Sequence, residues 1–400
     1  MKTFDQISAN NANNLFSATT NQQSQLDGIA NSALSRGIDA FTKGDNDAAI
    51  TEFKRSIGLS PYSDNSLKAY QLMASAYERQ GKTDEVIKAY QQAARLFSQS
   101  DIPHAKLGDI YFGQKNYKAA EGEYSRAVQL NPTLSANVYA LGQVYMAEGR
   151  YTDAETQFKK ITQLAPQDPS GYYALGQDYH KMGRYDDAVA QLNKSIQING
   201  KFVDAHLELG KTYADMKQTD KAKEQVDILS RADQSQSAQL QDYLVQVSAP
   251  KFIAAFNTSG FNASLGMGTA LSTMDSSLTA PDSSHMYTMN FIFSKDMDPT
   301  SVQNISNWLI SRSGYADPGG AYNWGLPSRP TEANISPLPI SVIYNADTLT
   351  ASVSFKITQN AVGDGTLDPS HIMFKFSGID TYKNGMDQTA DQYSGISQIA

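Results

Sequence analysis

A short motif that recurs every 34 residues constrains this 400-residue chain more than any other feature. The motif is Leu-Gly-x-x-Tyr, and its glycines are Gly108, Gly142, Gly176 and Gly210. Each glycine is followed after twelve residues by Ala and after sixteen by a large apolar residue. Segments around Met73 and Arg36 fit the same frame. A fixed period of this length predicts six stacked units, since one unit cannot bury its apolar face alone.

Each unit has the residues of a helix–turn–helix. Leu, Gly and Tyr at i, i+1 and i+4 share one face of a first helix, and the small glycine permits close approach of a second helix. Gly149 and Gly183 stand where a first helix should end, and Asp residues follow near the next helix start. Pro132 and Pro166 close two of the units. The pattern therefore predicts an all-α array.

These residues resemble the tetratricopeptide repeat over about residues 30–236. The resemblance implies a right-handed superhelix, an α-solenoid, with a concave inner wall. Residues 236–247 place apolar side chains at helical spacing, and we expect them to form a final helix that covers the exposed end of the array. The predicted array domain is residues 27–249.

The resemblance also implies which residues line the concave wall, because the family uses fixed positions of each first helix. A Tyr/Gln pair repeats there after 34 residues, which suits an extended peptide backbone. The alternative is that these positions are ordinary solvated helix faces. The predicted groove residues are Tyr139, Gln143, Met146, Tyr173, Gln177, His180, Lys181, Asp109, Phe112 and Lys211.

The composition changes near Pro250. Residues 1–249 hold 55 charged side chains, whereas residues 250–400 hold only 19. Apolar residues there run or alternate with a period of two between turn signals, which predicts short strands and an antiparallel β-sandwich. The predicted strands are residues 287–293, 308–310, 340–344, 349–357 and 371–376.

Residues 291–303, the pair Asn307-Trp308, and the later segments 376–380 and 384–387 resemble a bacterial immunoglobulin-like domain. The resemblance implies a sandwich over residues 285–400 that acts as an anchor, a spacer or a second binding surface. Residues 250–284 are predicted to be a linker or an edge strand. The chain has no Cys, so packing around Trp308, Phe291 and Phe374 must hold the sandwich.

Residues 1–26 are rich in Asn, Gln, Ser and Thr, and we expect a flexible polar leader there. The leader lacks the apolar core of a Sec signal peptide, and no stretch of the chain has the roughly 18 apolar residues of a membrane span. The sequence leaves the location unknown, with a cytoplasmic protein and export to the cell surface without a cleaved Sec signal as alternatives.

Several kinds of chemistry are not expected. The net charge of −8 argues against nucleic-acid binding. Without Cys, and with five scattered His, no metal site is expected. No nucleophile context or phosphate-binding loop suggests a catalytic residue or a cofactor, and His180 is expected to be a ligand contact or a solvated side chain. Asp296, Asp298, Asp364 and Asp368 could supply oxygens for Ca²⁺, but ordinary turn roles are expected.

The sequence thus predicts a non-enzymatic protein–protein interaction scaffold that binds a peptide or a partner protein in the concave groove. The alternative is a structural subunit of a bacterial surface or appendage assembly. Self-association into a homo-oligomer stays open.

Overall fold

The computed structural model describes residues 2–312, 330–333, 335–395 and 398–399, with side chains from residue 22 onward except those of residues 312 and 398. The chain divides into two compact units, Met1–Thr212 and Tyr213–Ala400. The first unit is helical. The second unit contains the last helices together with the whole β region, so this division differs from the predicted boundary near residue 249.

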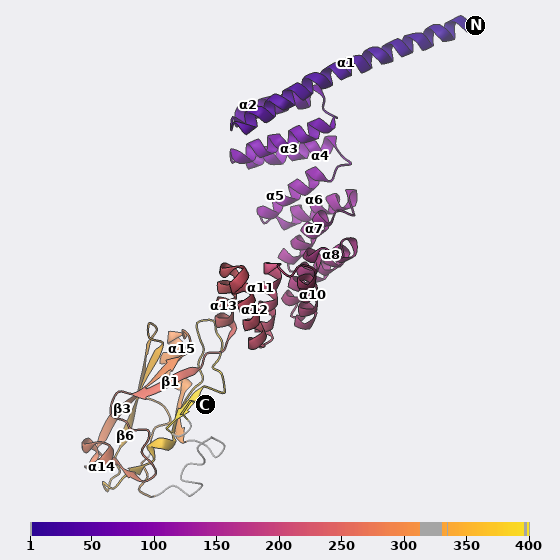
Figure 1. Cartoon of the computed structure of the whole chain (residues 1–400). Coiled ribbons are helices and arrows are strands. Elements are labelled where there is room, and N and C mark those ends of the chain that lie inside the picture. Colours follow the sequence, from indigo (N-terminus) through magenta and orange to yellow (C-terminus); the bar gives the residue numbers. More distant parts are fainter. Residues whose placement is uncertain (1, 313–329, 334, 396–397, 400) are drawn as a thin grey trace. The chain divides into compact units, whose positions relative to one another are not determined.

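In the first unit consecutive helices pack as antiparallel hairpins, with α1 against α2, α3 against α4, α5 against α6, α7 against α8 and α9 against α10 (Figure 1). The helices are α1 (Lys2–Thr42), α2 (Asn46–Leu59), α3 (Asp64–Arg79), α4 (Thr83–Leu96), α5 (Ile102–Gly113), α6 (Tyr117–Leu130), α7 (Ser135–Ala147), α8 (Tyr151–Leu164), α9 (Pro169–Lys181), α10 (Tyr185–Ile198), α11 (Val203–Asp215), α12 (Thr219–Ala232) and α13 (Gln234–Val247). The hairpins reproduce the predicted all-α solenoid.

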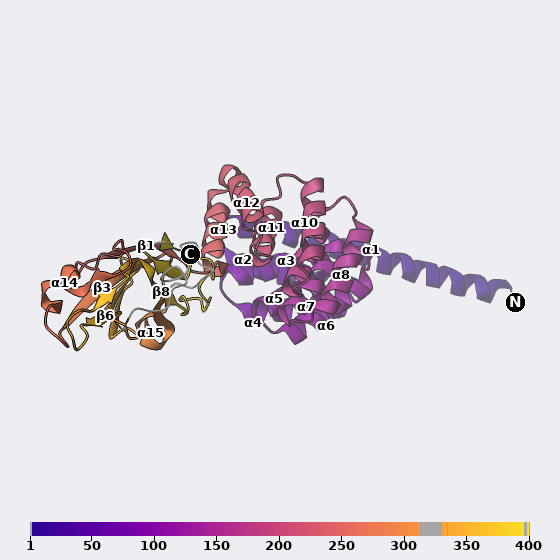
Figure 2. The same cartoon turned by 90° about the horizontal axis from the view of Figure 1, so that it is seen from below.

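Helix α1 is much longer than its neighbours (Figure 2). Its C-terminal part packs on α2 through buried residues such as Ala33 and Leu34. The backbone of residues 2–26 is helical, where the sequence predicted a flexible leader. No Pro or Gly interrupts the chain before Gly28, so the packed part of α1 can extend toward the N-terminus without a break.

Three of the repeated glycines each make room for one large side chain of the following helix. A Cβ added at Gly142 would lie 2.4 Å from the ring of Phe158, which is fully buried. The corresponding distances are 2.8 Å from Gly108 to Tyr124 and 2.5 Å from Gly176 to Leu192. Each large residue is the apolar one found sixteen positions after its glycine. The motif therefore reflects a packing requirement: a large side chain of the second helix fills the space beside the glycine, which has no side chain of its own.

Arginines join successive hairpins on the outside of the first unit. Arg150 stacks on Tyr145 at 4.3 Å from the ring centroid and pairs with Glu121 of the preceding hairpin at 2.9 Å. One period later, Arg184 stacks on Tyr179 at 4.2 Å and pairs with Glu155 at 3.3 Å. Both arginines are exposed to solvent, so these contacts add little stability and mainly set the geometry between neighbours.

The helix predicted to cover the array end is α13, which packs on α12. Asp233 caps its N-terminus by accepting hydrogen bonds from the backbone N–H groups of Ser235 and Gln236. Leu240 is fully buried on the side that faces α12, and Tyr243 donates a hydrogen bond of 2.9 Å to Asp215. Leu240 thus gives α13 an apolar inner side, whereas Val245 on the same helix is half exposed.

The β region contains two four-stranded antiparallel sheets, with strand orders β1-β3-β6-β5 and β10-β9-β8-β4, and a small pair β2-β7. Strand β1 lies at a sheet edge, within the segment for which a linker and an edge strand were the alternatives. The strands are β1 (Phe252–Asn257), β2 (Thr269–Ala270), β3 (Ser284–Phe293), β4 (Trp308–Arg312), β5 (Ser341–Asn345), β6 (Thr350–Thr358), β7 (Thr366–Leu367), β8 (Ile372–Phe376), β9 (Gln392–Ser394) and β10 (Gln398–Ile399).

Aromatic side chains from both sheets meet in one core, so the region is a β-sandwich. Phe291 of β3 lies 5.4 Å from Phe374 of β8 and 5.3 Å from Trp308 of β4, measured between ring centroids. Trp308, Phe291 and Phe374 are at most 1% exposed, as the sequence predicted. In sequence order the main strands give the arrangement ABED opposite CFG of constant-type immunoglobulin domains. Membership of the bacterial immunoglobulin-like family remains a prediction.

Candidate binding face of the repeat array

Helices α7 and α9 each carry one Tyr/Gln pair at i and i+4, which places the two side chains on one helix face. The pairs are Tyr139 with Gln143 and Tyr173 with Gln177, and we call these four residues the Tyr/Gln face. All four side chains are partly buried. The face belongs to the first unit, where the resemblance placed the concave wall.

The tyrosines are anchored by their rings. The ring centroid of Tyr139 lies 5.9 Å from that of Phe158, and the centroid of Tyr173 lies 5.0 Å from that of Phe202. Burial raises the pKa of both tyrosines above the usual range, and the carboxylate of Asp204 adds to the rise at both. Asp204 therefore acts electrostatically on the hydroxyls of both tyrosines.

The amides are already engaged with the tyrosines. Gln177 donates a hydrogen bond of 2.7 Å from Nε2 to the hydroxyl of Tyr173. Gln143 interacts with the hydroxyl of Tyr139 and partly offsets the rise in its pKa that burial causes. A side-chain amide has two donor hydrogens and an acceptor oxygen. Each glutamine thus keeps hydrogen-bonding capacity for a ligand backbone, while its tyrosine fixes its orientation.

His180 is held by the next first helix. Its Nδ1 lies 2.9 Å from Oε1 of Glu208 and 3.0 Å from Oγ1 of Thr212, and only 11% of its side chain is exposed. This position supports a structural or positioning role for His180 next to the Tyr/Gln face. Lys181, the following residue, is exposed.

The remaining predicted residues are placed differently. Asp109 accepts a hydrogen bond of 2.7 Å from the hydroxyl of Tyr124 and pairs with Lys106 at 3.0 Å, so its carboxylate serves α5 and α6. Phe112 packs on Tyr117 at 5.6 Å. Met146 and Lys211 are partly buried. The structure thus links the Tyr/Gln face to Asp204, Phe202 and Glu208. Of these, only Glu208 stood out in the sequence, as a neighbour of the predicted wall.

A buried carboxylate lies on the other side of α9. Asp178 is fully buried, and neither of its carboxylate oxygens has a hydrogen-bond partner among the described residues. Burial raises its pKa from 3.8 to about 7; the nearby Glu155 carboxylate adds to the rise and Arg184 opposes it. Val144 occupies the equivalent place one period earlier and is also fully buried. An acidic side chain at this buried position lowers the free energy of unfolding, whereas an apolar side chain there would not.

We expect Asp178→Val to raise the free energy of unfolding at pH 8 by about 1–3 kcal/mol, because an unsatisfied buried polar group disappears. In the folded chain Asp178 keeps its proton up to about pH 7, whereas the unfolded chain loses it near 3.8. Its penalty therefore grows between those pH values and is complete above them. Denaturant unfolding at several pH values measures the gain. Asp186→Asn, an exposed site on α10, removes the same charge and should leave stability nearly unchanged.

In the described part of the β region, Asp368, Ser370 and His371 form a group whose residue types are those of a hydrolytic triad. Ser370 donates a hydrogen bond of 2.6 Å to Asp368, and Nδ1 of His371 lies 2.9 Å from the same carboxylate. All three residues are buried. In a nucleophilic triad the carboxylate and the hydroxyl face different imidazole nitrogens. Here Ser370 lies on the Nδ1 side, 3.2 Å away, so the arrangement is a structural turn.

The four candidate calcium ligands also accept hydrogen bonds from the protein. Asp298 caps α15 (Pro299–Gln303) and pairs with Lys383 at 2.5 Å. Asp296 accepts from Tyr344, Asp364 from Asn360, and Asp368 from Ser370. Within the described ranges, no cluster of three or more His, Cys, Asp or Glu side chains could hold a metal ion. The described helices include none that is long and apolar enough to cross a membrane.

Sequence profiles of known families match the middle of the helical unit. The profile "Tetratricopeptide repeat" matches residues 72–135, and the profile "TPR repeat" matches residues 176–217. A third, "Anaphase-promoting complex, cyclosome, subunit 3", matches residues 113–195. Residues 72–217 form a tetratricopeptide repeat array. The 34-residue register and the hairpin of α1 with α2 continue the same pattern on the N-terminal side of the matched residues.

Comparison with solved structures finds partial similarity to several proteins. MamA is 24% identical, with 43% of this chain and 93% of MamA covered and a TM-score of 0.38. PilF of Pseudomonas aeruginosa is 18% identical, with 55% and 99% covered and a TM-score of 0.44. A tetratricopeptide repeat protein from Parabacteroides merdae is 17% identical, with 54% and 86% covered and a TM-score of 0.47. A comparison with curated proteins gives no significant match.

Proposed function

We propose that this protein is a non-enzymatic interaction scaffold whose tetratricopeptide array binds an extended peptide segment of a partner protein on the Tyr/Gln face. Arrays of this family present concave surfaces to protein ligands. The observation that carries the proposal is the repetition of a ring-anchored, hydrogen-bonded Tyr/Gln pair after one period. The β-sandwich then serves as an anchor, a spacer or a second surface.

The geometry suits a peptide backbone. Two amides held in the same orientation on successive first helices can donate to and accept from an extended chain, while the tyrosine rings pack against its side chains. Because ring packing and hydrogen bonds hold the amides before a ligand arrives, little conformational entropy is lost on binding.

A combined variant tests the proposal: Gln143→Ala, Gln177→Ala, Tyr139→Phe and Tyr173→Phe. Phe keeps the ring contacts with Phe158 and Phe202, whereas Ala at the tyrosines would leave cavities and destabilise the array. We expect the amount of partner protein captured by covalent cross-linking to be about tenfold lower with the variant than with the unchanged chain. The thermal midpoint of unfolding of the variant should change little. Quantitative mass spectrometry of covalently captured partners measures the loss. Unchanged recovery of every partner would contradict the proposal.

A further inference from the structure

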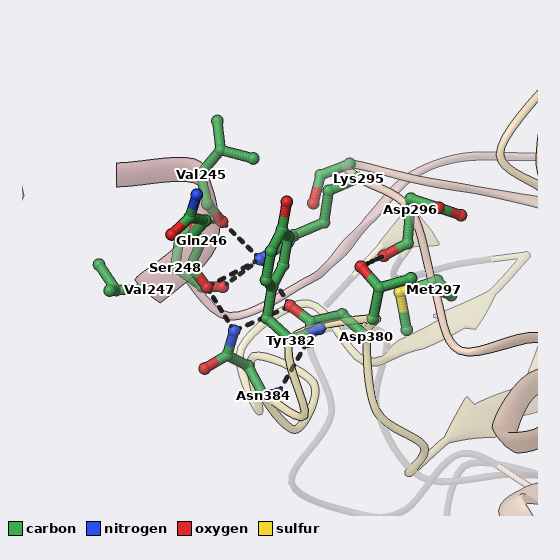
Figure 3. Close-up of polar contacts among 12 residues, drawn as sticks. Val245, Gln246, Val247, Ser248, Lys295, Asp296, Met297, Asp380, Tyr382 and Asn384 are labelled. Atoms are coloured by element: carbon green, nitrogen blue, oxygen red, sulfur yellow. Dashed lines mark hydrogen bonds and ion pairs between the residues drawn. The ribbon is translucent and has the colours of Figure 1, made fainter. Parts of the chain in front are cut away.

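A buried lysine joins the last helix of the array to the β region, within the second unit (Figure 3). Lys295 is 6% exposed, and its Nζ lies 2.5 Å from Oδ2 of Asp380, which is fully buried. The same ammonium donates hydrogen bonds of 2.5 Å and 2.8 Å to the carbonyls of Val245 and Ser248. A cation at this end of α13 also interacts favourably with the helix dipole.

The loop that carries Asp380 reinforces this junction. The carboxylate of Asp380 accepts hydrogen bonds of 2.8 Å from the backbone N–H groups of Tyr382 and Asn384. The side-chain amide of Asn384 donates to Asp380 at 2.9 Å and to the carbonyl of Gln246 at 2.6 Å (Figure 3). Hydrogen bonds and one ion pair thus hold the C-terminal end of α13 to the sandwich. They fix the positions of the surfaces on the two sides of this junction.

Two adjoining pockets open beside this junction. One has a volume of about 550 Å³ and lies between α12–α13 and the β region, and the other has about 220 Å³ and lies between α12 and α13. They share Lys217, Thr219, Val245, Val247 and Ser248 in their walls. The smaller pocket adds Ala214 and Leu244, so its lining is mainly aliphatic.

The charged residues around these pockets are mostly basic. Lys217 and Lys251 line the larger pocket together with one acid, Asp387, and Lys223 lines the smaller one. Lys217 donates a hydrogen bond to the carbonyl of Val247 at 3.1 Å. Lys223 and Lys251 are exposed, and within the described ranges neither ammonium forms an ion pair. In a chain with a net charge of −8, an aliphatic pocket with this basic rim is complementary to an acidic ligand.

We propose that the two pockets form a second binding site, which takes an acidic peptide segment of a partner protein. An aliphatic side chain of the segment packs against Val245, Val247 and Leu244, and its flanking carboxylates face Lys223 and Lys251. The Lys295–Asp380 pair positions the site by holding the two walls together. This site is separate from the Tyr/Gln face, and neither proposal depends on the other.

The test uses the full chain and two fluorescein-labelled, C-terminally amidated peptides in fluorescence anisotropy. One probe is Gly-Glu-Leu-Glu-Leu-Glu-Gly, and the matched probe has Gln in place of every Glu. We expect saturable binding of the acidic probe alone, weakened by added salt because exposed charges are screened. The double variant Lys223→Gln, Lys251→Gln should weaken binding by about tenfold, since it removes both cations that face the carboxylates of the probe.

The matched control is Lys118→Gln, Lys201→Gln, which removes the same charge from exposed sites of the first unit and should keep the affinity. Equal losses in both double variants would show attraction to net charge alone and overturn the proposal. Equal binding of both probes, or no saturable binding, would also overturn it. The combined Tyr/Gln-face variant should bind the acidic probe normally, so failure of one site is distinguishable from failure of the other.

Discussion

Replacing Lys295 with Met should lower the free energy of unfolding of the second unit by about 3–5 kcal/mol, because Asp380 then stays buried without its cation. Burial alone would raise the pKa of Asp380, but the hydrogen bonds from Lys295 and Asn384 outweigh it and hold the pKa below 3.8. The stabilisation that the pair provides is therefore fully present above about pH 3.8, the ordinary pKa of an aspartate. It is lost as the pH falls through the lower pKa of Asp380 in the folded state.

Denaturant unfolding followed by tryptophan fluorescence measures this loss, since Trp308 is buried in the β-sandwich and no tryptophan precedes it in the sequence. The matched control, Lys356→Met, makes the same substitution at an exposed site of β6. It should lower the free energy of unfolding by less than about 0.5 kcal/mol. The double variant Lys295→Met, Asp380→Leu removes both charges and should recover part of the stability. A loss no larger than that of Lys356→Met would contradict the role of the pair.

Replacing Gly142 with Ala should destabilise the array by about 1–3 kcal/mol, because the new Cβ would overlap the buried ring of Phe158. Gly122→Ala is the matched control. Gly122 lies on the exposed side of α6, and an added Cβ there meets nothing within 4 Å. Since Ala is a better helix former than Gly, this control should raise stability by up to about 1 kcal/mol.

The two glycine variants are therefore expected to change stability in opposite directions, although both make the same chemical change in a helix. Denaturant unfolding followed by far-ultraviolet circular dichroism measures both. A stabilising Gly142→Ala would mean that the repeated glycine is not a packing requirement in this array.

The array was predictable because its signal is local and repeated. The 34-residue period fixes the helix faces, and the glycine at the start of each unit and the large residue sixteen positions later are partners in the folded hairpin. The five strands predicted from apolar patterns correspond to β3, β4, β5, β6 and β8. Strands β2, β7, β9 and β10 were not predicted individually, since each has only two or three residues, and β1 lies in a segment for which a linker was the alternative. Strands β1 and β2 form by pairing with strands distant in sequence.

The Tyr/Gln face was predictable as a set of positions, but its interactions were not. The bond between Tyr173 and Gln177 follows from i,i+4 spacing, whereas contacts with Phe202 and Asp204 depend on how the next unit packs. Asp178 gave a signal that could have been used, because equivalent positions hold Ala76, Ile110 and Val144. The Lys295–Asp380 pair left no such signal, since its partners are 85 positions apart and joined only by the fold.

Site-specific photo-cross-linking tests the central claim most directly. A photoreactive benzoylphenylalanine is placed in turn at Gln143 and Gln177 on the Tyr/Gln face, and at the exposed positions Thr156 and Asn193 on α8 and α10. The account predicts that the first two positions cross-link one continuous segment of a partner protein, and that the second two do not. Cross-links to the same partner segment in equal yield from all four positions would contradict it.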